Sequence, residues 1–208
     1  MPRTFALDSL DPNLSLQRLR DGNRRFVAGN ETALRGWRPG LAEGQRPFAA
    51  ILGCSDSRAP AEYVFDQGLG DLFVIRVAGN VVAPSLVGSV EFAASQFGTR
   101  LVVVMGHSRC GGIAAALHAI DHGGMPESNN LKSIVDRITP NLTDLPPASD
   151  PSRVAVATRK NALASARDLV RSSPLLGDLV REGRVVVVAS VYDLETGVVE
   201  FLEQGARS

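Results

Sequence analysis

Residues 101–112 read LVVVMGHSRCGG: an apolar run, a short polar turn that carries a histidine and a cysteine, and two glycines. A continuous, β-branched apolar run of this kind is typical of a parallel strand that is covered on both faces. The segment that follows, 112–122, predicts a helix. A strand that passes through a tight turn into a helix is the repeating unit of an α/β sheet.

The rest of the chain repeats this alternation. Apolar runs predict further strands over 48–52, 72–77 and 184–191. Helices are predicted over 14–28, 85–98 (with Ser85 as the cap), 112–122, 128–138 and 152–170. We therefore expect an α/β fold with a central, mainly parallel β-sheet flanked by helices. Residues 198–202 follow a turn and predict an antiparallel strand at the edge of the sheet.

The chain is expected to form one domain over residues 1–208, with the segment 11–29 as an N-terminal helical arm. Of its 208 residues, 44% are hydrophobic, which is enough to build a substantial core. The stretch 30–47 is rich in Gly and Pro and predicts an extended connection. The stretch 139–151 predicts a surface loop, because too little chain follows it to form a second core.

Charge and cysteine content restrict the expected partners and location. The 22 basic and 22 acidic side chains cancel, so nothing points to a nucleic-acid or membrane partner. No apolar run approaches the roughly 20 residues that cross a bilayer, and the first residues lack the pattern of a secretory signal. Two cysteines do not make a disulfide framework, so we expect a cytoplasmic location.

Side chains that bind metals follow two of the predicted strands. Cys54 follows the strand over 48–52, and His107 and Cys110 follow the strand that begins at Leu101. Because the carboxyl ends of neighbouring parallel strands meet at one edge of a sheet, we expect these three side chains to converge. Two thiolates and one imidazole predict a zinc site whose fourth position is open, as in a catalytic site.

The surroundings of Cys110 favour metal binding over a simply buried thiol. Cys110 precedes a predicted helix, whose dipole favours the thiolate, and Arg58 and Arg109 are expected to act in the same direction. A redox dithiol is the competing interpretation. It is disfavoured because Cys54 and Cys110 lie far apart in the sequence instead of in a Cys-x-x-Cys motif.

Two motifs, CSDSR at 54–58 and GHSRCGG at 106–112, resemble those of the β-class carbonic anhydrases. The family pattern is Cys-x-Asp-x-Arg, with His-x-x-Cys about 50 residues later. The likeness continues through FDQGLGDLFVIR at 65–76 and AGN at 78–80. This resemblance implies one zinc ion per chain and reversible hydration of carbon dioxide to bicarbonate and a proton. Zinc lowers the pKa of a bound water, and the resulting hydroxide attacks the carbon of CO2.

The resemblance implies catalytic roles for Asp56 and Arg58. Asp56 accepts a hydrogen bond from the zinc-bound water, and Arg58 holds Asp56 in place through a bidentate pair. Some family members instead let this aspartate block the metal as a fourth ligand. Those that bind regulatory bicarbonate carry Trp three residues before the first cysteine, where this chain has Ile51. We therefore expect the open form, and a permanently closed, non-enzymatic zinc protein is the alternative.

The resemblance also implies a substrate pocket formed by Gln45, Phe73, Ala78, Phe92 and Gly111. The Gln45 amide would donate to an oxygen of bicarbonate or CO2. Ala78 and Phe92 replace a bulkier aliphatic residue and a tyrosine of some relatives, which predicts a roomier pocket with one hydroxyl fewer. Phe73 and Phe92 are also compatible with plain core positions. Hydrolysis of carbonyl sulfide or carbon disulfide is the competing activity, because the zinc hydroxide would act identically and only pocket width and access tunnels discriminate between these substrates.

The family assembles into dimers and larger oligomers, in which the N-terminal helix grips the partner and the active site lies near the shared interface. The resemblance therefore implies a homodimer or a homotetramer. The amphipathic segment 14–28 is equally compatible with packing on its own subunit.

His118 and His122 are spaced i, i+4, so a helix would place both on one face, where they could act as metal ligands. No third ligand accompanies them in the sequence. We interpret the pair as a solvated helix end, with a proton-shuttling role as the alternative.

Overall fold

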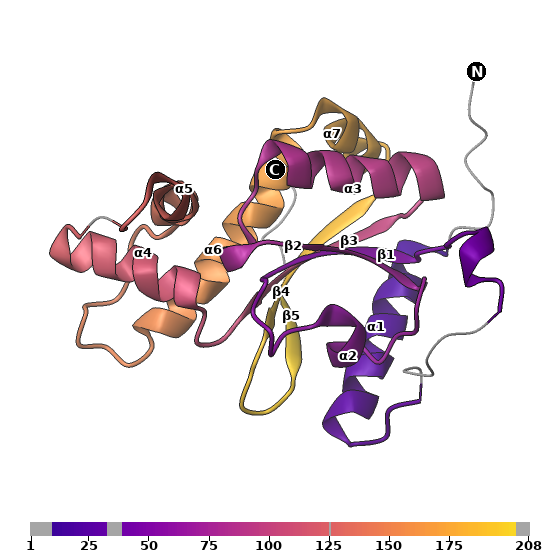
Figure 1. The fold of residues 1–208 in the computed structure, drawn as a ribbon, viewed down its shortest axis with the longest axis horizontal. Helices are drawn as coiled ribbons and strands as arrows, with labels where there is room; N and C mark the ends of the chain where they lie inside the picture. The colour runs from indigo at the N-terminus through magenta and orange to yellow at the C-terminus, as the bar shows by residue number, and fades with distance from the viewer. Residues whose placement is uncertain (1–9, 33–38, 125, 203–208) are drawn as a thin grey trace.

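The structure is a computed structural model that describes residues 10–32, 39–124 and 126–202 (Figure 1). Within these ranges the strands are β1 (Ala49–Gly53), β2 (Leu72–Arg76), β3 (Leu101–His107), β4 (Val186–Tyr192) and β5 (Val199–Leu202). They form one sheet in the order β2-β1-β3-β4-β5. The first four strands run parallel, and β5 pairs antiparallel with β4. The predicted sheet and its antiparallel edge strand are confirmed.

Seven α-helices occur in the described ranges: α1 (Pro12–Val27), α2 (Ala61–Val64), α3 (Pro84–Phe97), α4 (Gly111–His122), α5 (Asn129–Ile138), α6 (Arg153–Arg171) and α7 (Pro174–Arg181). Three short 3-10 turns are η1 (Leu41–Glu43), η2 (Ala78–Asn80) and η3 (Thr139–Asn141). The five predicted helices are confirmed to within two residues at each end. The sequence did not predict α2 and α7, which are short. Part of the expected connection 30–47 lies outside the described residues.

One predicted helix cap is wrong. Ser85 lies inside α3, because Ala83 occupies the cap position and Pro84 is the first helical residue. The first helical position suits proline, since its missing N–H has no acceptor there and its ring already fixes a helical φ.

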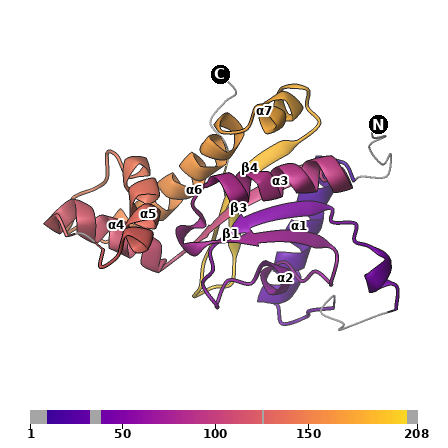
Figure 2. The same cartoon turned by 45° about the horizontal axis from the view of Figure 1, so that its top comes forward.

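The sheet is covered on both faces, as its apolar strands require. Along β1 the buried side chains alternate: Ala50 and Leu52 pack with α3, α6 and α7, whereas Ala49 and Ile51 pack with α1 and α2. Figures 1 and 2 show α3 and α7 on one side of the sheet and α1 and α2 on the other. This alternation fixes which residues of each strand face each helical layer.

Helices α4 and α5 lie outside this three-layer arrangement, away from the strands (Figure 1). They build a third apolar cluster that includes Ile113, Val135 and Ile138. Cys54 and Cys110 belong to the same cluster. The predicted metal ligands therefore lie where the sheet meets the α4–α5 unit.

Helix α1 packs closely on its own subunit. Leu19 is fully buried, and the Asn23 amide donates to the carbonyls of Val64 and Gly197. A Cβ atom added at Gly22 would lie 1.7 Å from the carbonyl oxygen of Phe65, so only glycine allows this approach. No helix in the described ranges is both long and apolar enough to cross a membrane.

Replacing Gly22 with alanine is expected to destabilise the fold by about 1–3 kcal/mol, because backbone atoms must move apart. The matched control is Gly177→Ala in α7, where the nearest atom to an added Cβ lies at an ordinary 3.7 Å. That substitution is expected to stabilise the helix by up to about 1 kcal/mol. Denaturant unfolding of the zinc-loaded proteins gives both values. Equal effects of the two substitutions would contradict the role assigned to Gly22.

Candidate metal centre

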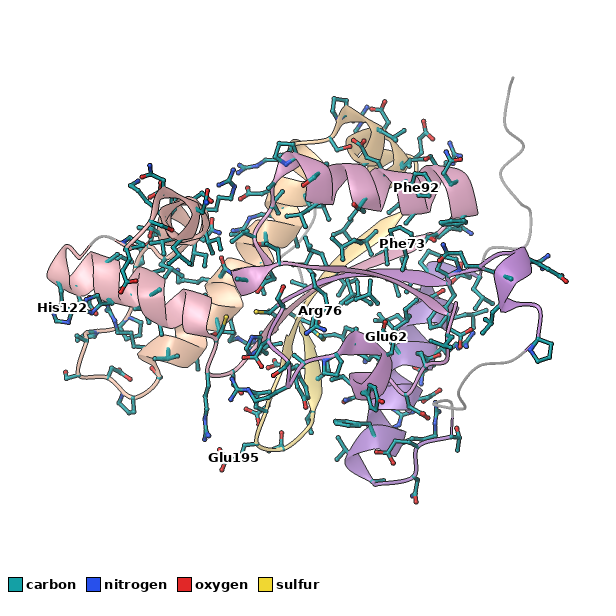
Figure 3. All side chains as sticks on the ribbon, viewed as in Figure 1. Glu62, Phe73, Arg76, Phe92, His122 and Glu195 are labelled. Carbon is teal, nitrogen blue, oxygen red and sulfur yellow. The ribbon has the colours of Figure 1, made fainter. Side chains whose placement is uncertain are left out.

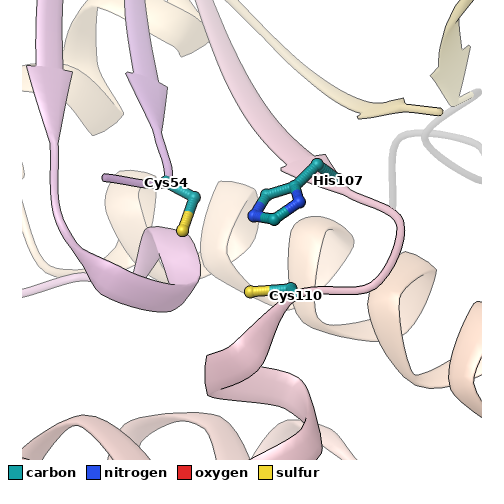
Figure 4. A group of neighbouring side chains, drawn as sticks. All are labelled: Cys54, His107 and Cys110. Carbon is teal, nitrogen blue, oxygen red and sulfur yellow. The ribbon is translucent and has the colours of Figure 1, made fainter. Parts of the chain in front are cut away.

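Cys54, His107 and Cys110 converge at the carboxyl ends of two adjacent strands (Figure 4). Cys54 directly follows β1, His107 is the last residue of β3, and Cys110 is the N-cap of α4. Their ligand atoms all lie within 4.8 Å of one another. A tetrahedral zinc ion with bonds of about 2.0–2.3 Å places its ligand atoms roughly 3.5–3.8 Å apart, so small side-chain rotations suffice.

The orientation of His107 fits a metal ligand. The side chain is 1% exposed, and its Nδ1 donates to the backbone carbonyl of Ser108 at 2.9 Å. This hydrogen bond leaves Nε2 with a free lone pair, and no described residue makes a hydrogen bond to it. A buried nitrogen without a partner is costly, and a bound metal ion removes that cost. Two thiolates and one imidazole are a donor set that zinc prefers.

The two thiols share a proton. A hydrogen bond from Cys110 lowers the pKa of Cys54, and the N–H of Gly79, 3.4 Å from the sulfur, acts in the same direction. The same hydrogen bond raises the pKa of Cys110. The predicted place of Cys110 before a helix is confirmed, and the N–H groups of Ile113 and Gly112 at the start of that helix lower the pKa of its thiol. The hydrogen bond with Cys54 outweighs this effect, so Cys54 ionises first.

Arg109 does not assist the thiols. Its side chain is paired with Glu195 at 2.8 Å in an exposed ion pair, and its backbone has a left-handed φ of 57°. The neighbouring Ser108 donates its N–H to the carbonyl of Tyr192 and accepts the N–H of Leu194 on its hydroxyl. The turn that separates the histidine from the second cysteine is thus attached to the end of β4.

The predicted pair between Asp56 and Arg58 is present. The Arg58 guanidinium donates to both carboxylate oxygens, at 2.9 and 2.7 Å. The Arg58 hydrogen bonds hold the pKa of Asp56 well below its usual range, so this carboxylate stays ionised at any working pH. Its Oδ2 lies 3.9 Å from Nε2 of His107. A carboxylate clamped by a guanidinium therefore stands beside the ligand cluster.

Two residues near the ligands received no role from the sequence. Arg76, at the end of β2, donates to the carbonyls of Cys54 and Asp56 at 3.0 and 2.6 Å, and so holds the first motif against the sheet. Gly79 has a φ of 68°, and an added Cβ would lie 2.6 Å from the Ile138 side chain. Both residues lie in the stretches 65–76 and 78–80 that resemble the family, which was the available signal.

Two of the five expected pocket residues lie beside the cluster. Ala78 begins the turn η2, one residue before the glycine that donates to Cys54. Gly111 follows Cys110 as the first residue of α4.

The other three expected pocket residues lie toward the opposite end of the sheet. Gln45 precedes β1, which is about 16 Å long, and lines a hollow of about 570 Å³ with Leu69 and Asp71. Phe73, near the start of β2, packs against Phe92 with ring centroids 6.2 Å apart. Figure 3 shows these two rings between β2 and α3, away from the end of β2 that carries Arg76.

Comparison with known proteins assigns the family. The family model described as carbonic anhydrase matches residues 49–199. Carbonic anhydrase 2 of Mycobacterium tuberculosis is 36% identical over 194 residues, covering 92% of this chain and 93% of its own. The carbonic anhydrase of Mycolicibacterium smegmatis is 38% identical over 195 residues, covering 91% and 93%. The crystal structure of the β-carbonic anhydrase CafA of Aspergillus fumigatus superposes with a TM-score of 0.72 at 28% identity, covering 81% of each chain.

A mostly parallel α/β sheet with a Cys-His-Cys cluster at its carboxyl edge is the arrangement of an α/β protein with a zinc site. The chain belongs to the β-class carbonic anhydrases, and its Cys54, His107 and Cys110 form the cluster typical of their zinc site. Its reaction is the reversible hydration of CO2.

Zinc affinity is expected to fall steeply as the pH falls, because zinc must displace protons from the cluster. Cys110, with its raised pKa, holds a proton at neutral pH. Burial disfavours the charged His107 ring, but contact with the Cys54 thiolate outweighs this and raises its pKa. Each displaced proton makes the affinity change about tenfold per pH unit. Chelator competition between pH 6 and 8 measures the slope, and an affinity independent of pH would contradict the shared proton.

Proposed function

We propose that this chain hydrates CO2 through an open site, in which Arg58 holds Asp56 away from the fourth position of the metal. The observation that carries this proposal is the bidentate pair in which the Arg58 guanidinium donates hydrogen bonds to both carboxylate oxygens of Asp56. The backbone N–H of Arg58 adds a third hydrogen bond to the same carboxylate, at 2.9 Å. Three donors from one residue fix the carboxylate, and swinging it onto a metal ion would break at least some of them.

The residues of the chain divide the work of the reaction. Zinc, when bound by the three ligands, supplies a Lewis acid that makes hydroxide available near neutral pH. Asp56 stays ionised and accepts a hydrogen bond from the water that is to be deprotonated, which orients that water. Because two thiolates offset the charge of the ion, it acidifies a bound water less than a site with three imidazoles does, and we expect activity to rise on the alkaline side of neutrality. Activity is already expected at pH 7, because Asp56 held by Arg58 leaves the metal open.

Three expected pocket residues lie far from the ligand cluster of their own chain. We infer that a second copy of the chain supplies them. We place Gln45, Phe73 and Phe92 of that copy over the ligand cluster, in a homodimer or a homotetramer built from such dimers. Phe92 is 50% exposed, and the outer edge of β2 has no strand partner among the described residues. Leu14 on α1 is 60% exposed and offers a further apolar contact to a partner.

The location of the protein remains a prediction. Cys54 and Cys110 are free thiols in the structure, and they bind zinc only while they stay reduced. A reducing compartment such as the cytoplasm meets this requirement.

The Arg58→Ala variant is expected to lose about 10–100-fold of the CO2 hydration rate at pH 7, because the freed Asp56 reaches the metal. Its activity should recover at alkaline pH, where hydroxide competes better for the metal. The measurement is stopped-flow CO2 hydration from pH 6.5 to 9 on protein of known zinc content.

The matched control for this prediction is Arg171→Ala, which removes another exposed arginine paired with an aspartate, Asp168, far from the site. Its activity is expected to match the parent protein. If Arg58→Ala keeps the parental rate at pH 7 with full zinc, the open-site proposal is wrong.

Two inactive variants are expected to restore activity when mixed. Cys54→Ser disrupts the metal cluster but keeps Gln45. Gln45→Ala keeps the metal cluster but removes the glutamine. In a mixed dimer one of the two sites combines an intact cluster with an intact glutamine, so random mixing should recover about a quarter of the parental activity. The measurement is CO2 hydration after dissociation and reassociation of the mixture. Failure to recover activity in proven mixed dimers would place Gln45 outside the partner's site.

A further inference from the structure

His118 and His122 lie side by side in the last turns of α4. Their ring centroids are 4.8 Å apart and the ring planes are tilted by 50°. The chain contains three histidines, and the third, His107, is 1% exposed. The two exposed histidines of the protein are therefore immediate neighbours. Figure 3 shows His122 at the end of α4 that points away from the sheet.

The separation of the rings matches that of two imidazoles on one metal ion. With metal–nitrogen bonds of about 2.0–2.1 Å and cis coordination, the ring centres lie roughly 4.5–5 Å apart. A tilted arrangement at 4.8 Å therefore needs little side-chain movement to bind an ion. Residues four apart on a helix share one face, so the backbone holds this spacing.

The end of the helix favours a cation. His122 is the last residue of α4, and Gly123 caps the helix in a left-handed conformation with a φ of 65°. The negative pole of the helix dipole lies at this end. Asp121, the nearest carboxylate in sequence, is engaged in an ion pair with Arg153 at 2.5 Å and faces that partner. The charge of Asp121 is thus balanced by Arg153, and its carboxylate does not serve as a ligand beside the two histidines.

We propose that His118 and His122 form a second metal site, which binds a divalent transition-metal ion such as Ni²⁺, Cu²⁺ or Zn²⁺ through two imidazoles. Within the described ranges, the one group of three metal-binding side chains close enough to share an ion is Cys54, His107 and Cys110. The histidine pair on α4 thus has no third protein ligand. Water therefore fills the remaining positions of the second site. Imidazole selects these borderline ions over Mg²⁺ and Ca²⁺.

The second site is separate from the catalytic zinc. His118 and His122 lie 8 and 12 residues beyond Cys110, which corresponds to about 12 and 18 Å along the helix axis. These distances exclude direct contact with the zinc cluster and direct proton exchange with a water there. An ion held by this pair would therefore be independent of the zinc cluster.

The test is calorimetric titration of the zinc-loaded enzyme with NiCl2, while a colorimetric indicator follows any zinc released. The expected result is one Ni²⁺ bound per chain with zinc retained. His118→Ala and His122→Ala should each weaken Ni²⁺ binding at least about tenfold, because the second imidazole acts at a high effective concentration. CO2 hydration should stay at the parental rate in both variants.

A spacing variant is the matched control. Combining Ile120→His with His122→Ala keeps two surface histidines on α4 but sets them i, i+2, on different faces of the helix. It should bind Ni²⁺ as weakly as the single variants. The proposal is overturned if the parent protein binds no Ni²⁺, if one equivalent of zinc leaves as Ni²⁺ binds, or if the spacing variant binds as tightly as the parent.

Discussion

The parallel pairing of β1 with β3 is the constraint on which the site depends. Their register places Gly53 opposite Met105, so both strands end at the same edge of the sheet. Cys54 and His107 therefore leave the sheet together, and the turn after His107 brings Cys110 back as the cap of α4. Because side chains alternate between faces, a slip of one residue would turn one ligand to the other side of the sheet. The apolar, fully buried strands resist such a slip, since it would also misplace Ala50 and Leu52.

Two arginines fix the segment that contains Asp56, in addition to the pairing of the strands. Arg58 fixes Asp56 through its side chain, whereas Arg76 holds the backbone of the same segment from the neighbouring strand. The two arginines act on different atoms, one on the carboxylate and the other on carbonyl oxygens. Side chain and backbone of Asp56 are thus fixed separately, which is what the proposed open site requires.

The features that could be predicted from the sequence are those that a short stretch of residues determines by its own hydrophobic pattern. Strands such as β3 are marked by continuous apolar runs, and the ligands follow strand ends, so both the sheet and the convergence of Cys54 with His107 could be predicted. The order of acidity of the two thiols could not, because it arises from a hydrogen bond between residues distant in the sequence. The four-residue helix α2 is too short to show a helical period. The contacts of Arg76 likewise exist only once β2 lies beside β1.

The positions of the expected pocket residues show that one chain alone does not bring all of them to the metal ligands. A strand crosses the sheet in a single direction, so residues before β1 and residues after it lie at opposite edges. Gln45 and Cys54 flank the same strand, and no rearrangement within an intact sheet brings them together. Either Gln45 serves no role in the reaction, or a second copy turns its opposite edge toward the metal. The exposed Phe92 beside the open edge of β2 favours the second arrangement, because an isolated subunit leaves this aromatic surface in water.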